Sequence, residues 1–268
     1  MKLINKILSA VVASTLLFGC SSNEEDKTPG DKEFILNVEK ALEDRWDVAD
    51  ETDANNLTGA KQQRAFEKAT DVEYDAIGKL SKYEFEDKDL KKAAEIYMKG
   101  LDLQKEGVQY VGTDDYNNQN KTWILGMNYR IVSLKTFEKD FGLTVGSKYK
   151  EDFDDMLAQY SVAKKEVAIQ EFVNDLQSKI TYTKDEAKSD EYTTYYTTVI
   201  ENTTEYTIDS LQIQINFLDE SGVVIEQEAD YLQNIAAESK VQSSVMYLNE
   251  AEPSQLKVTV SAGVSNSL

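Results

Sequence analysis

The clearest fold signal in the chain is Leu211-Gln212-Ile213-Gln214-Ile215-Asn216-Phe217. Its apolar side chains alternate strictly with amide side chains, and this period of two is typical of a β-strand with one buried face and one solvent-facing face. The sequence on both flanks is rich in Thr, Tyr, Val and Ile and is divided by turn residues. We therefore expect a β-domain around this stretch.

Further strands are predicted on both sides of it, each bounded by polar or turn-forming residues. They span residues 192–200, 223–228, 231–235, 240–248 and 256–261, and residues 179–183 could add an edge strand. Six or seven short strands within about 85 residues are typical of a small antiparallel β-sandwich.

This region also resembles the FxLYD-type domain, an immunoglobulin-like sandwich of extracellular proteins. The matching stretches are Val199-Ile200-Glu201-Asn202, Ile215-Asn216-Phe217-Leu218-Asp219, Gly222-Val223-Val224-Ile225 and Ala237-Glu238. Ile215, Phe217 and Leu218 replace the Phe, Leu and Tyr that give the family its name. The resemblance implies an immunoglobulin-like fold, and it implies neither an enzyme activity nor functional residues.

Upstream of the β-domain, the apolar residues recur at helical spacing. The first stripe joins Ile35, Val38, Leu42, Trp46 and Ala49. Further helices are predicted at about 60–80, from an N-cap at Asp87, from Asp114-Asp115 to Phe141, and at about 149–178. With no proline between Pro29 and Pro253, four or five helices predict an antiparallel bundle.

The predicted fold class is therefore segregated α+β, with an N-terminal antiparallel helical bundle followed by a small immunoglobulin-like β-sandwich. The predicted domains are a signal peptide (1–19), a lipidated Cys with a disordered tether (20–30), the bundle (31–178) and the FxLYD-like sandwich (179–268).

The first nineteen residues have the pattern of a signal peptide. Lys2 and Lys6 precede an apolar run at 7–18, which is shorter than the roughly 20 residues that a membrane-spanning helix needs. Leu17-Phe18-Gly19-Cys20 then resembles the lipobox of bacterial lipoproteins, which implies cleavage after Gly19 and a diacylglyceryl group on the Cys20 sulfur. The alternative is an ordinary secretory signal followed by an incidental Cys. Residues 20–30 are polar and end in Pro-Gly, which indicates a tether.

The composition excludes several classes of function. The formal charge is -20, which argues against a nucleic-acid partner because phosphates require clustered Lys and Arg. The chain has no His and one Cys, so Ser-His-Asp and Cys-His nucleophiles and the common zinc sites are excluded. We expect no cofactor and no metal.

Two acidic clusters are candidates for calcium ligands. One comprises Asp47, Asp50, Glu51 and Asp53, and the other comprises Asp114, Asp115, Asn117, Asn118 and Asn120. Neither has the Gly and Glu positions of an EF-hand loop, so solvated turns and N-caps are the favoured interpretation.

The aromatic residues are candidates for recognition. Trp46 and Trp123 lie on apolar helical stripes and are expected in the core rather than as sugar-stacking platforms. Seven of the fifteen tyrosines lie in the β-region, where they could form a recognition face or simply reflect strand propensity.

The leading functional hypothesis is a non-enzymatic lipoprotein on the extracytoplasmic face of the cell membrane. It would be held by the lipid on Cys20 and would contact a protein or a cell-wall polymer. The alternatives are a lipid-anchored receptor for a solute or wall polymer and a carboxylate-dependent glycan hydrolase. The sequence identifies no catalytic or ligand-binding residue.

Overall fold

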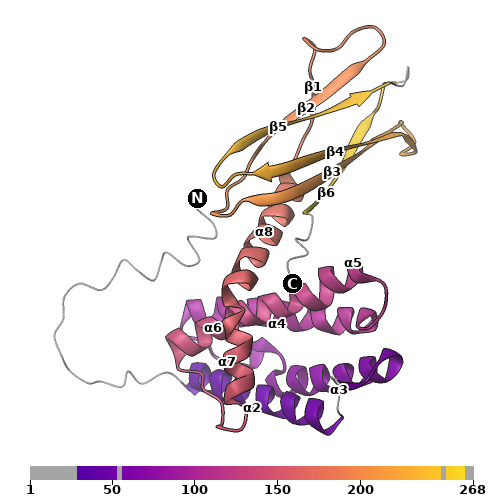
Figure 1. Ribbon diagram of the computed structural model, residues 1–268. Coiled ribbons are helices and arrows are strands. Elements are labelled where there is room, and N and C mark those ends of the chain that lie inside the picture. Colours follow the sequence, from indigo (N-terminus) through magenta and orange to yellow (C-terminus); the bar gives the residue numbers. More distant parts are fainter. Residues whose placement is uncertain (1–28, 53–55, 249–251, 263–268) are drawn as a thin grey trace, which may run out of the picture. The chain divides into compact units, whose positions relative to one another are not determined.

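The computed structural model describes residues 29–52, 56–248 and 252–262. Helices occupy the N-terminal part of these residues and strands the C-terminal part, which confirms the segregated α+β class (Figure 1). The chain divides into two compact units, and the division falls between Val167 and Ala168, inside helix α8. The sequence placed the change from bundle to sandwich at residues 178 and 179.

The helical unit is built from long helices joined by short connectors and single turns. Its elements are α2 (Pro29–Glu51), α3 (Gly59–Ile77), η3 (Leu80–Lys82), α4 (Lys88–Gly107), η4 (Val108–Tyr110), α5 (Tyr116–Gln119), η5 (Asn120–Ile124), α6 (Leu125–Phe141), α7 (Lys150–Ala158) and the first part of α8 (Tyr160–Lys179). Asp87 caps α4 as predicted, because its carboxylate accepts hydrogen bonds from the backbone N–H groups of Asp89 and Leu90.

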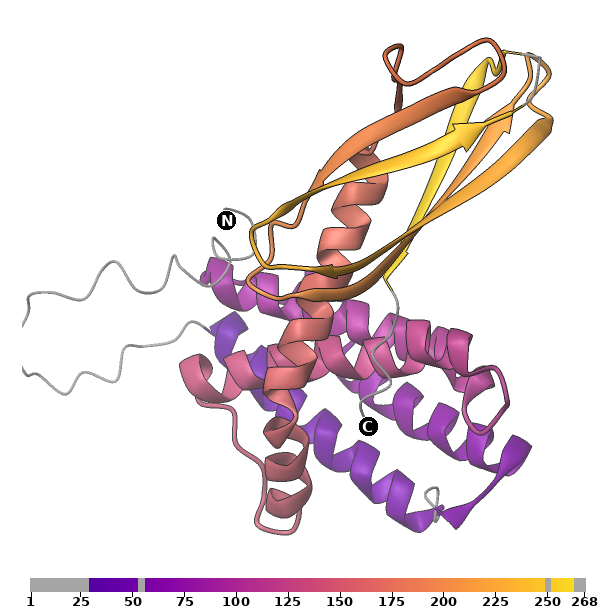
Figure 2. The same ribbon diagram turned by 45° about the horizontal axis from the view of Figure 1, so that its top comes forward.

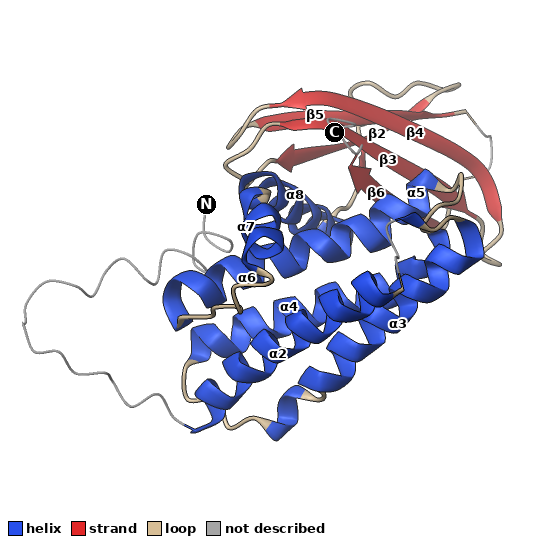
Figure 3. Ribbon diagram, turned by 60° about the horizontal axis from the view of Figure 1, so that its bottom comes forward, coloured by secondary structure: helices blue, strands red, loops and turns tan. Residues whose placement is uncertain are grey.

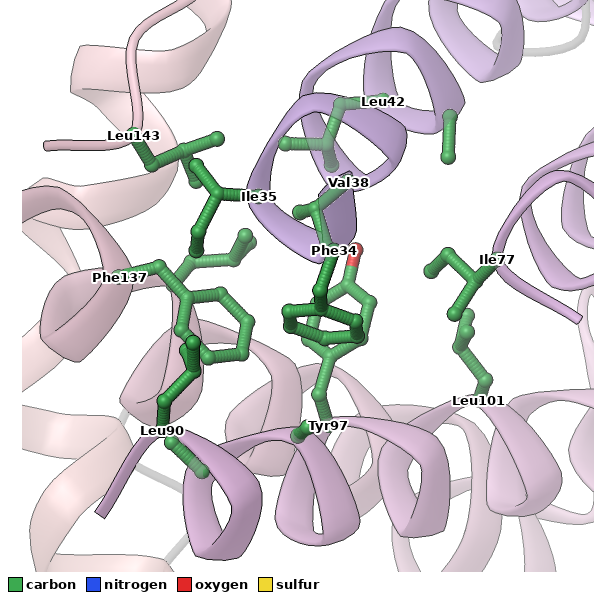
Figure 4. Close-up of a cluster of buried hydrophobic side chains, with 14 of the residues drawn as sticks. Phe34, Ile35, Val38, Leu42, Ile77, Leu90, Tyr97, Leu101, Phe137 and Leu143 are labelled. Atoms are coloured by element: carbon green, nitrogen blue, oxygen red, sulfur yellow. The ribbon is translucent and has the colours of Figure 1, made fainter. Parts of the chain in front are cut away.

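Helices α2, α3, α4 and α6 form the bundle and run antiparallel to their neighbours (Figure 3). For example, Gln63 near the start of α3 donates a hydrogen bond to the carbonyl of Gln109, just beyond the end of α4. The bundle core contains Phe34 and Phe137, whose ring centroids lie 5.4 Å apart, and Tyr97 packs on Phe137 at 5.6 Å (Figure 4). All three side chains are fully buried, so aromatic packing between α2, α4 and α6 contributes strongly to stability.

Two predicted helices differ from the structure. The helix expected from Asp114-Asp115 to Phe141 contains a π-helical segment, η5, between α5 and α6. The helix expected at 149–178 is divided at Gln159 into α7 and α8. The apolar residues of this region serve two separate cores, with Phe153 in the bundle and Phe172 in the sandwich. The change of core partner falls inside α8, between Val167 and Ala168, so it does not account for the break at Gln159.

The β-unit contains two three-stranded antiparallel sheets (Figure 2). One has the order β1-β2-β5 and the other the order β4-β3-β6. The strands are β1 (Thr183–Lys184), β2 (Thr194–Glu201), β3 (Ile208–Leu218), β4 (Val224–Ile235), β5 (Lys240–Tyr247) and β6 (Gln255–Ala262).

Strand β3 has the predicted alternation. Leu211, Ile213, Ile215 and Phe217 are at most 1% exposed, whereas the side chains between them lie on the opposite face of the sheet. The strands predicted at 223–228 and 231–235 are one continuous strand, β4. Asp230, in the predicted gap, accepts hydrogen bonds from the Ser243 hydroxyl at 2.6 Å and the Ser244 backbone N–H at 3.2 Å. These bonds to β5 hold a residue of low strand propensity within the strand.

The last turns of α8 belong to the sandwich core. Ile169, Phe172 and Val173 are buried together with the inward side chains of the sheets. The Gln177 amide donates a hydrogen bond to the Val258 carbonyl at 2.7 Å and accepts one from the Val260 N–H at 2.6 Å. Because β6 is an edge strand, Gln177 satisfies part of an otherwise unpaired strand edge.

Buried Asn202, directly after β2, binds the backbone of two separate segments of the β-unit. Its side-chain amide donates to the carbonyls of Tyr206, Ile235 and Ala236 at 2.8–3.1 Å. One side chain therefore holds the β2–β3 connection against the end of β4.

Candidate functional site

The most distinctive polar arrangement in the helical unit is a buried ionic network. We define it as Arg45 on α2, Glu73 on α3, Tyr97 and Gln104 on α4, and Arg130 on α6. None of these residues is more than 9% exposed, and Glu73 is fully buried. Charged side chains reach this depth only when they are paired and hydrogen-bonded.

The Glu73 carboxylate is the centre of the network. Arg130 Nη2 donates to its two oxygens at 2.6 and 2.8 Å, Arg130 Nε donates to Oε1 at 3.1 Å, and Arg45 Nη1 donates to Oε2 at 2.6 Å. The Tyr97 hydroxyl also donates to Oε1. The side-chain oxygen of Gln104 accepts from Arg45 Nη1 at 3.1 Å and Arg130 Nη1 at 3.2 Å. One carboxylate and one amide therefore bind two guanidinium groups.

The charges shift the pKa values of the network in opposing directions. Burial alone raises the pKa of Glu73, but the charges of Arg130 and Arg45 outweigh burial and lower it. Burial, followed by the like charge of Arg130, lowers the pKa of Arg45. For Arg130 burial acts downward, but the charge of Glu73 raises the pKa overall. Burial and the Glu73 charge raise the pKa of Tyr97.

Glycines let the helices approach closely enough to build the network. A Cβ at Gly100 of α4 would lie 2.7 Å from the carbonyl oxygen of Gly126 on α6, and one at Gly126 would lie 2.6 Å from the carbonyl oxygen of Gly100. One turn beyond each glycine on its own helix stand Gln104 and Arg130. The glycine crossing therefore places two network residues next to each other.

A third glycine lies beside the π-helical segment η5. A Cβ at Gly107 would lie 2.4 Å from the backbone nitrogen of Trp123. The Trp123 ring is buried, and the Arg45 guanidinium lies 5.9 Å from its centroid. The network is thus continuous with the packing around η5.

This geometry suits helix registration better than proton transfer. A carboxylate with a lowered pKa and both oxygens occupied by cationic donors is a poor general acid. Two arginines against one glutamate leave an excess positive charge inside the bundle. Among the described side chains, Gln104 Nε2 and Thr70 Oγ1 are the buried polar atoms without a hydrogen-bond partner.

The buried ionic network is not among the features predicted from the sequence. The signal that could have revealed it is a polar residue on an apolar helical stripe. Glu73 lies four residues after Ala69 and four before Ile77, and both neighbours are buried. Gln104 likewise follows Leu101 on the stripe of α4. Polar residues at core positions indicate a buried network, but sequence spacing alone does not show which helices pair them.

The residues that the sequence singled out are not brought together. The lipobox with Gly19 and Cys20, together with Asp53 of the first acidic cluster, lies outside the described residues. Asp47 pairs with Lys148, and Asp115 caps α5. Within residues 29–52, 56–248 and 252–262, no group of three or more Asp, Glu, Cys or His side chains could hold a metal ion.

Both tryptophans pack with apolar side chains, as predicted, with Trp123 buried and Trp46 half-buried against the bundle core. Trp123 is 6% exposed, and Trp46 stacks on Tyr149 with 5.8 Å between ring centroids. The tyrosines of the β-unit range from buried through half-buried to exposed. Tyr182 and Tyr247 are buried, whereas Tyr192 and Tyr231 are 77% and 66% exposed. Exposed Tyr231 lies within strand β4, whereas exposed Tyr192 lies before β2.

Comparisons with known proteins give no family for this chain: neither a protein-family model nor a curated protein matches it. In the part of the chain that the structure describes, no helix has the length and apolar character needed to cross a membrane.

Proposed function

We propose that this chain is a non-enzymatic lipoprotein, anchored on the extracytoplasmic face of the cell membrane, whose two folded units make contacts in the cell envelope. The observation that carries the proposal is the sequence Leu17-Phe18-Gly19-Cys20 at the end of a short apolar segment. Two acyl chains on Cys20 would give stable membrane attachment, which a single chain does not. The polar residues 21–30 would separate the folded units from the membrane surface.

The residue types of the chain support a non-enzymatic role. Histidine is absent from the sequence and the one cysteine is the proposed lipid attachment point. The deepest carboxylate of the helical unit, Glu73, is bound by two arginines and a tyrosine. The polar core is therefore committed to internal hydrogen bonds rather than left open to a substrate.

The segregated fold favours a contact protein over a solute receptor. Receptors that feed transporters usually contain alternating strand-helix-strand units, with ligands at the carboxyl ends of parallel strands. Here both sheets are antiparallel, and the long helices precede them in the chain. Such a fold presents sheet and helix faces rather than a binding crevice at strand ends.

In-cell crosslinking tests the contact role. The tagged full-length protein would be crosslinked in intact cells and isolated from the membrane fraction, with Cys20→Ala as the matched control. We expect specific partners, protein or wall polymer, that are lost with the Cys20→Ala variant. An abundant, membrane-attached protein that crosslinks to nothing would contradict the contact role.

A further inference from the structure

The outer face of sheet β4-β3-β6 carries mostly uncharged polar side chains, which are exposed or half-buried. The strand register defines three adjacent rows across β4, β3 and β6. These rows are Tyr231–Gln212–Ser261, Ala229–Gln214–Thr259 and Gln227–Asn216–Lys257. Facing residues on neighbouring strands lie about 5 Å apart, and successive rows about 7 Å apart. We call these nine residues the amide face.

The amide face contains no acidic side chain. The whole chain carries 49 Asp and Glu residues and a net charge of -20, yet Lys257 is the one charged residue among these three rows. Strand β4 contains Glu226, Glu228 and Asp230, but they pair with Phe217, Ile215 and Ile213. Those three partners are buried, so the acids of β4 lie on the other side of the sheet.

Internal hydrogen bonds order part of the amide face. Gln227 Nε2 donates to Asn216 Oδ1 at 2.8 Å, and Gln212 Nε2 donates to the Tyr231 hydroxyl at 3.1 Å. Each side-chain amide can both donate and accept further hydrogen bonds. The Tyr231 ring is 66% exposed and provides an apolar surface beside the amides. The face thus combines pre-ordered amides, hydroxyls and one exposed aromatic ring.

The side-chain composition of the amide face favours some classes of ligand over others. One lysine cannot neutralise a polyphosphate or a nucleic acid. The rows contain no large aliphatic side chain, so they offer little to a lipid surface or an apolar protein patch. Uncharged sugars carry the complementary groups, because their hydroxyl and acetamido groups donate and accept hydrogen bonds and their C–H faces pack on aromatic rings.

We propose that the amide face binds an uncharged glycan, through the side-chain amides of Gln212, Gln214 and Asn216 and the ring of Tyr231. The inference rests on the proposed envelope location, which gives this face access to glycans. It assigns the contact to the β4-β3-β6 sheet, and it does not involve the ionic network of the helical unit.

Co-sedimentation with insoluble polysaccharides tests the proposal. The full-length lipidated protein in detergent micelles would be incubated with chitin, cellulose and starch, and the bound fraction measured against protein concentration. We expect saturable retention on at least one of these polymers. Retention on none of them would overturn the proposal, even if crosslinking identified a protein partner and so upheld the broader proposed function.

Matched double variants locate the binding face. Gln214→Glu with Thr259→Glu places two carboxylates in the middle row, and we expect at least a tenfold loss of affinity. Thr197→Glu with Gln242→Glu adds the same charge to the outer face of the other sheet, where we expect no loss. Equal losses in the two variants would show a general charge effect and would refute binding at the amide face.

Tyr231 provides an independent check that does not change charge. We expect Tyr231→Ala to lower the affinity several-fold and Tyr231→Phe to retain most of it, because the ring and not the hydroxyl packs on the sugar. Unchanged affinity in Tyr231→Ala would contradict the proposed role of the ring. Far-UV circular dichroism and the thermal midpoint would verify that each variant is folded.

Discussion

Replacement of Glu73 by Gln is expected to destabilise the helical unit severely. The substitution keeps the size of the side chain but removes the charge that binds two buried guanidinium groups. It also turns one acceptor into an NH₂ donor facing donors of Arg45 and Arg130. Loss of one partner from a buried ion pair costs about 3–5 kcal/mol. For a unit of this size the thermal midpoint would fall by roughly 10–20 °C.

The assay is thermal and urea unfolding followed by circular dichroism at a helical wavelength. Asp71→Asn is the matched control. Asp71 lies on the same helix and forms an ion pair with Lys105 of α4, and both side chains are at least 40% exposed. We expect that control to cost about 1 kcal/mol or less. A Glu73→Gln variant no less stable than the Asp71→Asn control would refute the central role of the carboxylate.

A triple variant, in which all three charged residues of the network are replaced, distinguishes the cost of unpaired charge from the cost of lost packing. Arg45→Met, Glu73→Leu and Arg130→Met together remove all three charges, and replacement of a buried ionic triad by apolar residues is often neutral or stabilising. We expect the triple variant to be more stable than Glu73→Gln alone. If instead it were as unstable as the single variant, the cost would come from lost packing or from the buried Tyr97 hydroxyl and Gln104 amide left without their partners, and not from unpaired buried charge.

Three further predictions concern pH, helix packing and the sheet edge. Because the pKa of Glu73 is lowered in the folded state, the unfolded chain binds more protons below pH 4.5. The free energy of unfolding should therefore fall with acidification, and it should fall less steeply in Glu73→Gln. Identical slopes in the two proteins would contradict this. Gly100→Ala should lower the free energy of unfolding in urea by about 1–3 kcal/mol, because its Cβ would meet backbone atoms. The Cβ of Gly146→Ala would come closest to a flexible side chain, at 3.1 Å, so this control should lower it less. Equal losses would argue against the close crossing of α4 and α6. Gln177→Ala should lower the free energy of unfolding by roughly 1–3 kcal/mol and raise self-association in light scattering, since it exposes the β6 edge. Gln170→Ala, on the same helix, loses one exposed hydrogen bond and should do neither.

The sequence predicted what local periodicity determines. The alternation at Leu211–Phe217 predicted β3 and its buried side. The helical stripes predicted the bundle, the burial of Trp123 and the packing of Trp46 against the bundle core. The Asp87 N-cap also followed from local chemistry, since a carboxylate satisfies the free N–H groups of the first turn.

Features that depend on contacts between distant segments were missed. The residues around Asp230 have low strand propensity, and β4 continues there because its carboxylate binds groups of β5. The helix predicted at 149–178 is divided at Gln159, and its apolar residues serve two cores. Glu73 and Arg130 are 57 residues apart in sequence, so no local pattern could pair them. The outward amides of β3, by contrast, were visible in the sequence, but the rows that they form with β4 and β6 require the sheet register.

The lipoprotein proposal depends above all on the chemical state of Cys20, which can be measured. The protein would be isolated from the membrane fraction of the native host and the mass of its N-terminal peptide determined, with Cys20→Ala analysed in parallel. We expect a peptide that begins at Cys20 and carries a diacylglyceryl group, and a Cys20→Ala protein that is not lipidated. A mature N-terminus elsewhere, or an unmodified Cys20 thiol on the exported protein, would contradict the lipoprotein assignment.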